Sequence, residues 1–353
     1  MKRSSENTRI KRKYFAYLRG AEQLSDATIE KVAVSLTFFE TAMGFKDFKR
    51  HNLTWPERLK ETLIDATNAA GKPLSRSTRS NHMRHVRGFI RWLADKPGYK
   101  SRIGWSDAEY YKLSRKDERV ASEHRDPIYP MPDHALMAFR AMSDDTELQR
   151  RDRAIFAFFL MTGARVKATS TLKLKRIDLV NKTVNQDARD VDTKAAKTFL
   201  TAFYIIAPEV WEAFARWVAY LYDVKFFGPE DPLFPKCGIA NNAHGNFVSE
   251  TVARAHWAQT GSIRAIIKDT FQRVHMTAYG PHSFRHMLTH IGMDICITPR
   301  ALKAWSLNFG HSDVMTTLQN YGKLTSREQV AEIQKLSNPT CTQQSNLPIL
   351  TGL

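Results

Sequence analysis

Apolar residues recur at helical spacing early in the chain. Ser25 is placed to cap a helix, and Gly44 is placed to follow its end. The apolar positions of this helix are Ile29, Val32, Leu36 and Phe39. Their spacing of three to four residues predicts one buried face of an amphipathic helix.

A second helix is predicted from Ser77 to Ala94, with an apolar and a basic stripe along it. The apolar stripe consists of Met83, Val86, Ile90 and Leu93. The basic stripe consists of Arg84, Arg87 and Arg91, with Arg76 and Arg79 near the start. A basic stripe is usually a solvated face, but this one contains no acid between residues 76 and 94. We therefore interpret it as a surface that contacts nucleic-acid phosphates.

The pattern changes between Gly98 and Asp133. This stretch is polar, has no period and contains three prolines, which favours an interdomain linker. Helical spacing returns from His134 to Met142, and a strongly apolar helix is predicted from Ala154 to Met161. Gly163 would end that helix.

Residues 183–205 have the period of a strand instead. Phe199, Thr201, Phe203 and Ile205 alternate with their neighbours, so we expect a small β-hairpin or meander. Pro208 opens a following helix that carries Trp211, Phe214 and Trp217. Thr298 and Pro299 open another helix.

These elements predict a mainly α fold with a small antiparallel β-sheet. We expect a helical N-terminal domain over residues 1–120, a linker over 121–133 and an α+β domain over 134–337. Residues 338–353 are polar and are expected to form a mobile tail that offers few apolar anchors for a neighbouring protomer. Fewer than about 25 residues precede the first strong helix, so we expect no further N-terminal domain.

The balance of charge points to a polyanionic partner. The chain has 353 residues, a formal net charge of +17 and a sequence pI near 9.8. Such an excess of cations favours nucleic acid through neutralisation of phosphates. No apolar run approaches the roughly 18 residues of a membrane span, and the N-terminus lacks the apolar stretch of a signal peptide. A cytoplasmic, DNA-associated location without membrane contact is expected.

Three short patterns carry the candidate chemistry. The first is Arg165, directly after the Thr162-Gly163-Ala164 turn. The second is the run 282–286, in which His282 and Arg285 are three residues apart on one helix face. The third is His311 after Gly310, followed ten residues later by Tyr321. Each pattern alone is weak, because such residues often have structural roles.

Together these residue types suit attack on a phosphodiester. Two guanidinium groups can each hold two phosphate oxygens and so replace a metal ion. A tyrosine oxygen can act as the nucleophile if cations assist its deprotonation, while histidine and lysine transfer protons. The set requires neither a metal nor a cofactor. The sequence contains no GxxxxGK[ST] phosphate loop, no HExxH motif and no carboxylate cluster for two metals.

In the order and spacing of these motifs the chain resembles the tyrosine recombinases, the family that includes the phage integrases. The match covers residues 150–325 well, and the N-terminal third only as a basic helical domain of the expected size. The resemblance implies a core-binding domain and a catalytic domain that clamp DNA from opposite sides. It also implies DNA cleavage and rejoining through a 3′-phosphotyrosyl intermediate, without metal or ATP.

The resemblance assigns a role to each matching residue. Arg165 and Arg285 would grip the scissile phosphate, and His282 would act as a base or donate a hydrogen bond to the phosphate. His311 would contact the phosphate as well. Tyr321 would attack and leave a free 5′ hydroxyl.

The general-acid lysine of the family lies in a β-hairpin between the first arginine and the histidine motif. Lys194 fits that place better than Lys197, which remains the alternative. His286 also matches the family pattern, and we expect it to support the site from behind. The family commonly has a glutamate three residues after the first arginine, but this chain has Ala168. Another group must then orient Arg165.

The resemblance favours a site-specific recombinase or integrase. Its expected partners are double-stranded DNA with a specific recombination site, three further copies of the chain in a homotetramer on two duplexes, and accessory DNA-bending proteins. A type IB topoisomerase would use the same residues as a monomer. A DNA-binding factor that kept the fold without catalysis is the other alternative.

Overall fold

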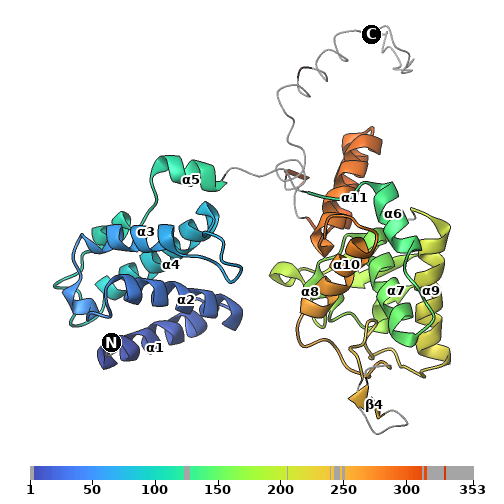
Figure 1. Cartoon of the computed structure of the whole chain (residues 1–353), viewed down its shortest axis with the longest axis horizontal. Helices are drawn as coiled ribbons and strands as arrows, with labels where there is room; N and C mark the ends of the chain where they lie inside the picture. Colours follow the sequence, from blue (N-terminus) through green and yellow to red (C-terminus); the bar gives the residue numbers. More distant parts are fainter. Residues whose placement is uncertain are drawn as a thin grey trace, which may run out of the picture. The chain divides into compact units, whose positions relative to one another are not determined.

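The computed structural model describes residues 4–122, 128–204, 206–238, 240–241, 247–248, 251–311, 314–315 and 330. The chain divides into two compact units, residues 1–125 and 126–353 (Figure 1). The division falls inside the stretch 121–133 that we expected to be a linker. Tyr321 and the predicted tail, residues 338–353, lie outside the described residues. No helix in the described ranges is both long and apolar enough to cross a membrane.

The N-terminal unit is helical throughout its described part. Its elements are α1 (Ser5–Gly20), α2 (Asp26–Ala42), η1 (Phe48–Arg50), α3 (Trp55–Asp65), α4 (Arg76–Ala94), η2 (Trp105–Tyr110) and α5 (Arg115–Ser122). Helix α4 packs against α2, α3, η2 and α5. Both predicted helices of this unit are confirmed, and Ser25 occupies the N-cap position of α2.

The apolar stripe of α4 faces the core as predicted. Met83, Val86, Ile90 and Leu93 are all buried. The stretch that begins at Gly98 is not a linker over its first part, because Tyr99, Ile103, Ala108 and Tyr111 are buried in the same core. The short 3₁₀ helix η2 explains why no α-helical period is visible there.

The C-terminal unit combines helices with two small sheets. Its helices are α6 (Pro132–Arg140), α7 (Glu147–Thr162), α8 (Val166–Thr169), η3 (Leu174–Arg176), η4 (Lys194–Ala196), α9 (Pro208–Asp223), α10 (Gly261–Arg273), α11 (Pro281–Ile295) and α12 (Pro299–Asn308). Its strands are β1 (Ile177–Asp178), β2 (Thr183–Gln186), β3 (Phe199–Ala202), β4 (Ala240–Asn241) and β5 (Phe247–Val248).

Helix α7 lies at the centre of this unit and contacts α6, α9, α10 and α11 (Figure 1). Every residue from Ala154 to Met161 is buried, as expected of a helix that is apolar on all sides. A capping box of Thr146 and Gln149 begins the helix. Gly163 ends it with a left-handed backbone, φ 56°. The predicted helix is therefore confirmed and begins at Glu147, about two turns earlier than expected.

The predicted hairpin is confirmed as part of a three-stranded antiparallel sheet with the order β1-β2-β3. Gln186 pairs with Phe199, and Val184 pairs with Thr201. The alternation places Thr201 inside and Leu200 outside. The loop between β2 and β3 contains both candidate lysines.

Candidate active site

Arg285 lies at the meeting point of three helices. It sits on α11 and is 2% exposed. Its guanidinium donates to the carbonyl oxygen of Gly163 at 3.2 Å and to that of Phe309 at 2.6 Å. These residues are the C-caps of α7 and α12, where the last helical carbonyls lack partners within their helices. Arg285 therefore holds the two helix ends together while its own position is fixed.

Gly163 allows this close approach. A Cβ atom there would lie 3.0 Å from a ring carbon of Phe309 and 3.1 Å from the Cα of Arg285. The positive φ adds strain for any residue with a side chain. The glycine before the first candidate arginine is thus required both by conformation and by packing against α11.

His311 accepts a hydrogen bond from Arg285. The distance from the Arg285 guanidinium nitrogen to Nε2 is 2.8 Å, and His311 is buried. An arginine can only donate, so Nε2 is the unprotonated nitrogen and the proton of a neutral ring is on Nδ1. Burial is the largest cause that lowers the pKa of His311, and with the cations Arg285, Arg165, Lys197 and Lys194 it brings the pKa to about 3. His311 is therefore neutral at pH 7.

His282 lies in the first turn of α11, one turn before Arg285. Partial burial lowers its pKa to about 4, and Arg285, Arg165, Lys194 and Arg264 contribute in the same direction. The amino end of a helix carries partial positive charge that adds to these cations. The charged groups that shift the pKa of His282 and of His311 most are all cations. An anion in this place would meet a strongly positive potential.

Arg165 comes directly after the turn at Gly163 and occupies the N-cap of α8. The charge of its guanidinium acts on both His282 and His311 and contributes to lowering the pKa of each. Ala168, where the resemblance leads us to expect a glutamate, is buried in the apolar core. Arg165 thus reaches the cluster although no carboxylate is present at position 168.

The two candidate lysines have different surroundings. Lys194 is exposed in η4, and its charge reaches both His282 and His311. Lys197 is half-buried, and its ammonium donates to the carbonyl oxygen of Gly310 at 3.1 Å. Both lysines therefore face the cluster, but Lys197 is bound to the backbone beside His311.

Asn308 holds the hairpin of β2 and β3, whose loop carries the two candidate lysines, against the end of α12. Its side-chain amide accepts from the backbone N–H of Ala202 at 2.7 Å and donates to the carbonyl of Ala202 at 2.9 Å. The hydroxyl of Thr201 donates to the backbone carbonyl of Asn308 at 2.8 Å. The ring of Phe199 packs on Gly310, where a Cβ would lie 2.6 Å from it. Sequence reasoning missed Asn308, because nothing in the local pattern indicates its partner a hundred residues away.

The structure brings together most of the predicted site. Arg165, Lys194, His282, Arg285 and His311 belong to one cluster by the contacts and pKa effects above. The ring of His286 lies edge-on to that of His282, with centroids 4.8 Å apart. Tyr321 lies outside the described residues, so the cluster is described without it. Within the described ranges, no group of three or more His, Cys, Asp or Glu residues is placed to hold a metal ion.

The predicted basic stripe on α4 is only partly available for a ligand. Glu109 on η2 pairs with Arg87 and Arg91, each at 2.5 Å, and with Lys112. These partners lower the pKa of Glu109 to about 2. The stripe contains no acid of its own, but the fold supplies acids from two other elements: Glu109 on η2, and Asp117 on α5, whose carboxylate lies 3.4 Å from Arg76. The other three members of the stripe, Arg76, Arg79 and Arg84, lie outside the ion-pair cluster of Glu109.

No family model matches the sequence. Among curated proteins, the tyrosine recombinase XerC of Lactobacillus delbrueckii subsp. bulgaricus is 25% identical over 181 residues, which are 49% of this chain and 54% of that protein. The chain thus spans about half the length of this relative. The tyrosine recombinase XerC of Treponema denticola is 25% identical over 334 residues, 92% of this chain and 97% of the relative.

Solved structures share the fold at low sequence identity. A lambda integrase dimer bound to a core site has a TM-score of 0.61 at 12% identity and covers 90% of this chain and 97% of its own. The Tn1549 transposon integrase in complex with transposon right end DNA has a TM-score of 0.58 at 17% identity, with coverages of 93% and 99%. The XerH recombinase bound to its difH substrate also scores 0.58, at 13% identity, with coverages of 93% and 83%. In sequence the chain is similar to curated tyrosine recombinases, and it shares the fold of these solved structures.

Proposed function

We propose that this protein is a site-specific DNA recombinase that cuts and rejoins DNA strands through Tyr321. The observation that carries the proposal is the cationic cluster around two neutral imidazoles. Arg165, Arg285 and Lys194 supply positive charge, and burial together with these cations lowers the pKa of His282 and of His311. This is an environment that stabilises the extra negative charge of a phosphodiester in its transition state.

Each group has a role that follows from its chemistry. Arg165 and Arg285 would hold the non-bridging oxygens of the scissile phosphate, with Arg285 already fixed by two helix ends. Neutral His282 can take the proton of the Tyr321 hydroxyl as the phenolic oxygen attacks phosphorus. The bond from phosphorus to the 5′ oxygen then breaks and leaves a 3′-phosphotyrosyl link. Attack by a 5′ hydroxyl of another strand reverses these steps and rejoins the DNA.

The departing 5′ oxygen requires a proton, which we assign to Lys194. Its ammonium is exposed and lies close enough to influence both histidines. Lys197 stays the alternative, but its ammonium already donates to the carbonyl of Gly310. We assign Lys197 instead to holding the hairpin against the segment that carries His311.

His311 has a positioning role in addition to a phosphate contact. Its Nε2 accepts from Arg285, so it helps aim the guanidinium before any ligand arrives. A bound phosphate would favour the charged form of the ring, because an adjacent anion raises the pKa of an imidazole. His311 could then donate to a phosphate oxygen, as the resemblance implies.

The proposed partner is double-stranded DNA with a specific recombination site. Solved relatives are described as bound to a core site, to transposon end DNA and to a difH substrate. Arg76, Arg79, Arg84, Arg87 and Arg91 on α4 are proposed to contact phosphates from the N-terminal unit. Glu109 reduces the net positive charge that Arg87 and Arg91 offer to DNA. Strand exchange requires four cleavages, so we further propose a homotetramer on two duplexes, with accessory DNA-bending proteins.

Trapping a covalent adduct tests the chemistry, the nucleophile and the site together. A nicked substrate loses the strand piece that must re-attack, so a cleaved phosphotyrosyl complex accumulates. We expect an adduct with the natural chain and none with Tyr321→Phe, which should bind DNA as well as the natural chain. Cleavage that persists in the Phe variant would disprove the nucleophile. A chain that binds the site but forms no adduct would be a non-catalytic DNA-binding factor.

A type IB topoisomerase would share the adduct, so a second assay is needed. Such an enzyme relaxes supercoiled plasmid as a monomer without a partner site. We expect no relaxation of a plasmid that lacks the recombination site. We expect joint molecules only when two sites are present.

A further inference from the structure

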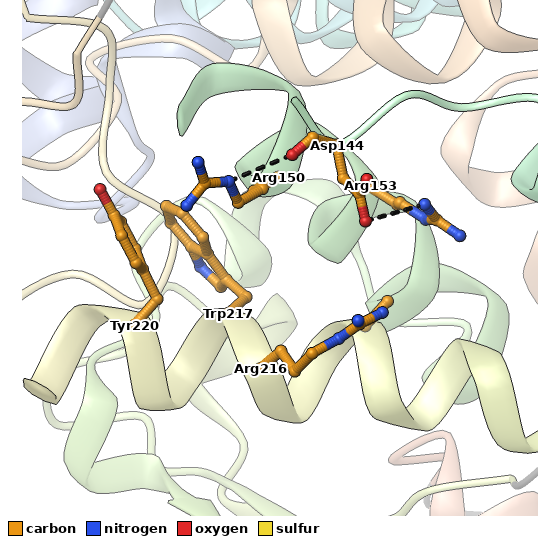
Figure 2. A pocket seen from close by; sticks show the side chains of 7 residues that line it. Asp144, Arg150, Arg153, Arg216, Trp217 and Tyr220 are labelled. Carbon is orange, nitrogen blue, oxygen red and sulfur yellow. Dashed lines mark hydrogen bonds and ion pairs between the residues drawn. The ribbon is translucent and has the colours of Figure 1, made fainter. Parts of the chain in front are cut away.

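A second cationic cluster lies at the other end of α7 from the candidate active site. It lines a pocket of about 330 Å³ between α7 and α9. Figure 2 shows the side chains that line it, which include Arg150, Arg153, Arg216, Trp217, Tyr220 and Asp144. Arg153 and Thr162 are nine positions apart on α7, which corresponds to roughly 14 Å of helix at 1.5 Å per residue. The pocket is therefore separate from the cluster around Arg285.

Two of the three arginines are held in place by the loop before α7. Arg150 donates to the backbone carbonyls of Asp144 and Asp145 at 3.1 and 3.2 Å, and its guanidinium lies 5.1 Å from the ring centre of Tyr220. Arg153 donates to the carboxylate of Asp144 at 3.0 Å (Figure 2). These contacts fix the two guanidinium groups at the pocket wall.

Arg216 and part of Arg153 are left without protein acceptors. Arg216 projects from α9 and donates to no residue that the structure describes. The Nε of Arg153 is buried and has no hydrogen-bond partner among the described residues. A buried donor without an acceptor is unfavourable, and an anion in the pocket would supply the acceptor.

The charge of the pocket is strongly positive. Asp144 is the one acidic residue in its described lining, against three arginines. Glu147, in the first turn of α7, is bound by Lys225 at 2.9 Å and by the backbone N–H of Val252. The amino end of α7 adds partial positive charge. Three guanidinium groups against one carboxylate match a ligand with two negative charges.

We infer that this pocket binds a phosphate group, with Arg150 and Arg153 as a fixed wall and Arg216 as the arm that closes on it. Guanidinium forks bind phosphate through paired hydrogen bonds, and the cavity lies at the lower end of the sizes found for small-ligand sites. The volume leaves room for the group that carries the phosphate. The phosphate could belong to a free nucleotide or to a DNA backbone outside the cleavage site.

Calorimetric titration of inorganic phosphate into the full chain tests the inference. Arg165→Gln is introduced throughout, so that the candidate active site contributes less to the signal. Arg216→Gln is then compared with Arg140→Gln. Arg140 is an exposed arginine of the same unit that pairs with Glu209 outside the pocket. Arg216 is exposed and makes no hydrogen bond or ion pair to a described residue, so its replacement should leave the fold intact.

We expect saturable binding that Arg216→Gln weakens on the order of tenfold or more, the usual effect of losing hydrogen bonds to a charged group. Arg140→Gln should leave the affinity within about twofold, because it removes the same charge elsewhere. Arg216→Lys should weaken binding to an intermediate degree, since the charge remains but the fork is lost. Equal affinity in the Gln variants, or no saturable binding at all, would overturn the inference.

Competition identifies the source of the phosphate. A mononucleotide that displaces phosphate, with no loss of duplex affinity in Arg216→Gln, indicates a free nucleotide. A random-sequence duplex that displaces phosphate and binds Arg216→Gln more weakly indicates a DNA backbone. Either result supports the phosphate site.

Discussion

His311 should make the stability of the C-terminal unit depend on pH in a way that a single substitution removes. In the folded chain its Nε2 accepts from Arg285 and its pKa is lowered to about 3. In the unfolded chain the pKa returns to about 6.5. As the pH falls, the unfolded chain therefore takes up the proton first. The stability that the neutral ring contributes is present above pH 6.5 and is lost as the pH falls from there towards 3.

The size of the effect follows from the two pKa values. At about pH 5 the unfolded histidine is mostly protonated and the folded one is not, which amounts to about 2 kcal/mol relative to about pH 8. Because the folded pKa lies well below 5, this figure depends almost entirely on the unfolded value. His311→Gln keeps an acceptor for Arg285 but cannot titrate. The variant should therefore lose about 2 kcal/mol less than the natural chain over this pH range.

Hydrogen exchange of the α11 amides reports the unfolding of this unit alone. The two proteins differ only at position 311, so the difference between the two pH profiles isolates His311. A profile that is equally steep in the variant would refute the assignment of a buried neutral ring. Added phosphate should reduce the steepness in the natural chain if the anion raises the pKa of His311.

Four further outcomes are expected. Arg165→Lys should reduce the yield of covalent adduct by far more than it reduces DNA binding, because the positive charge remains but the paired N–H donors of the guanidinium are lost. Equal losses in gel-shift and adduct assays would contradict this. Gly163→Ala should lower the free energy of unfolding in urea by at least about 1–2 kcal/mol, the strain of a left-handed backbone, and an unchanged midpoint would argue against the packing described. Lys194→Met should slow cleavage more than Lys197→Met in single-turnover measurements, and the reverse order would exchange their roles. DNA affinity should fall on the order of a thousandfold between about 50 and 200 mM salt if six or more phosphates are contacted. An affinity that does not change with salt would contradict the proposal that phosphate contacts dominate DNA binding.

Periodicity and caps predicted elements in both units. Ser25, Gly163 and Thr298 occupy the cap positions expected of them, because capping depends on residues only a few positions apart. The sheet that carries the lysines was visible as an alternation that includes Phe199 and Thr201. The resemblance then supplied the grouping of distant motifs, which local spacing cannot provide.

Other elements were missed for physical reasons. Helix α1 carries its apolar residues at Ile10, Tyr14 and Leu18, but the charged residues between them hide this narrow stripe. The stretch after Gly98 reads as a linker because its buried aromatic residues follow a 3₁₀ helix and irregular turns. Glu109 neutralises part of the α4 arginines only once the chain has folded, and no sequence window contains that pairing.

The amide of Asn308 has a consequence for how the molecule behaves among other proteins. Strand β3 is the outer strand of its sheet, and an outer strand presents unpaired N–H and C=O groups to any passing chain. Asn308 satisfies both groups of Ala202 on that strand. With these two groups already bound, a strand of another molecule cannot pair with β3 at Ala202. The Asn308 side chain thus protects this sheet edge from association with other chains.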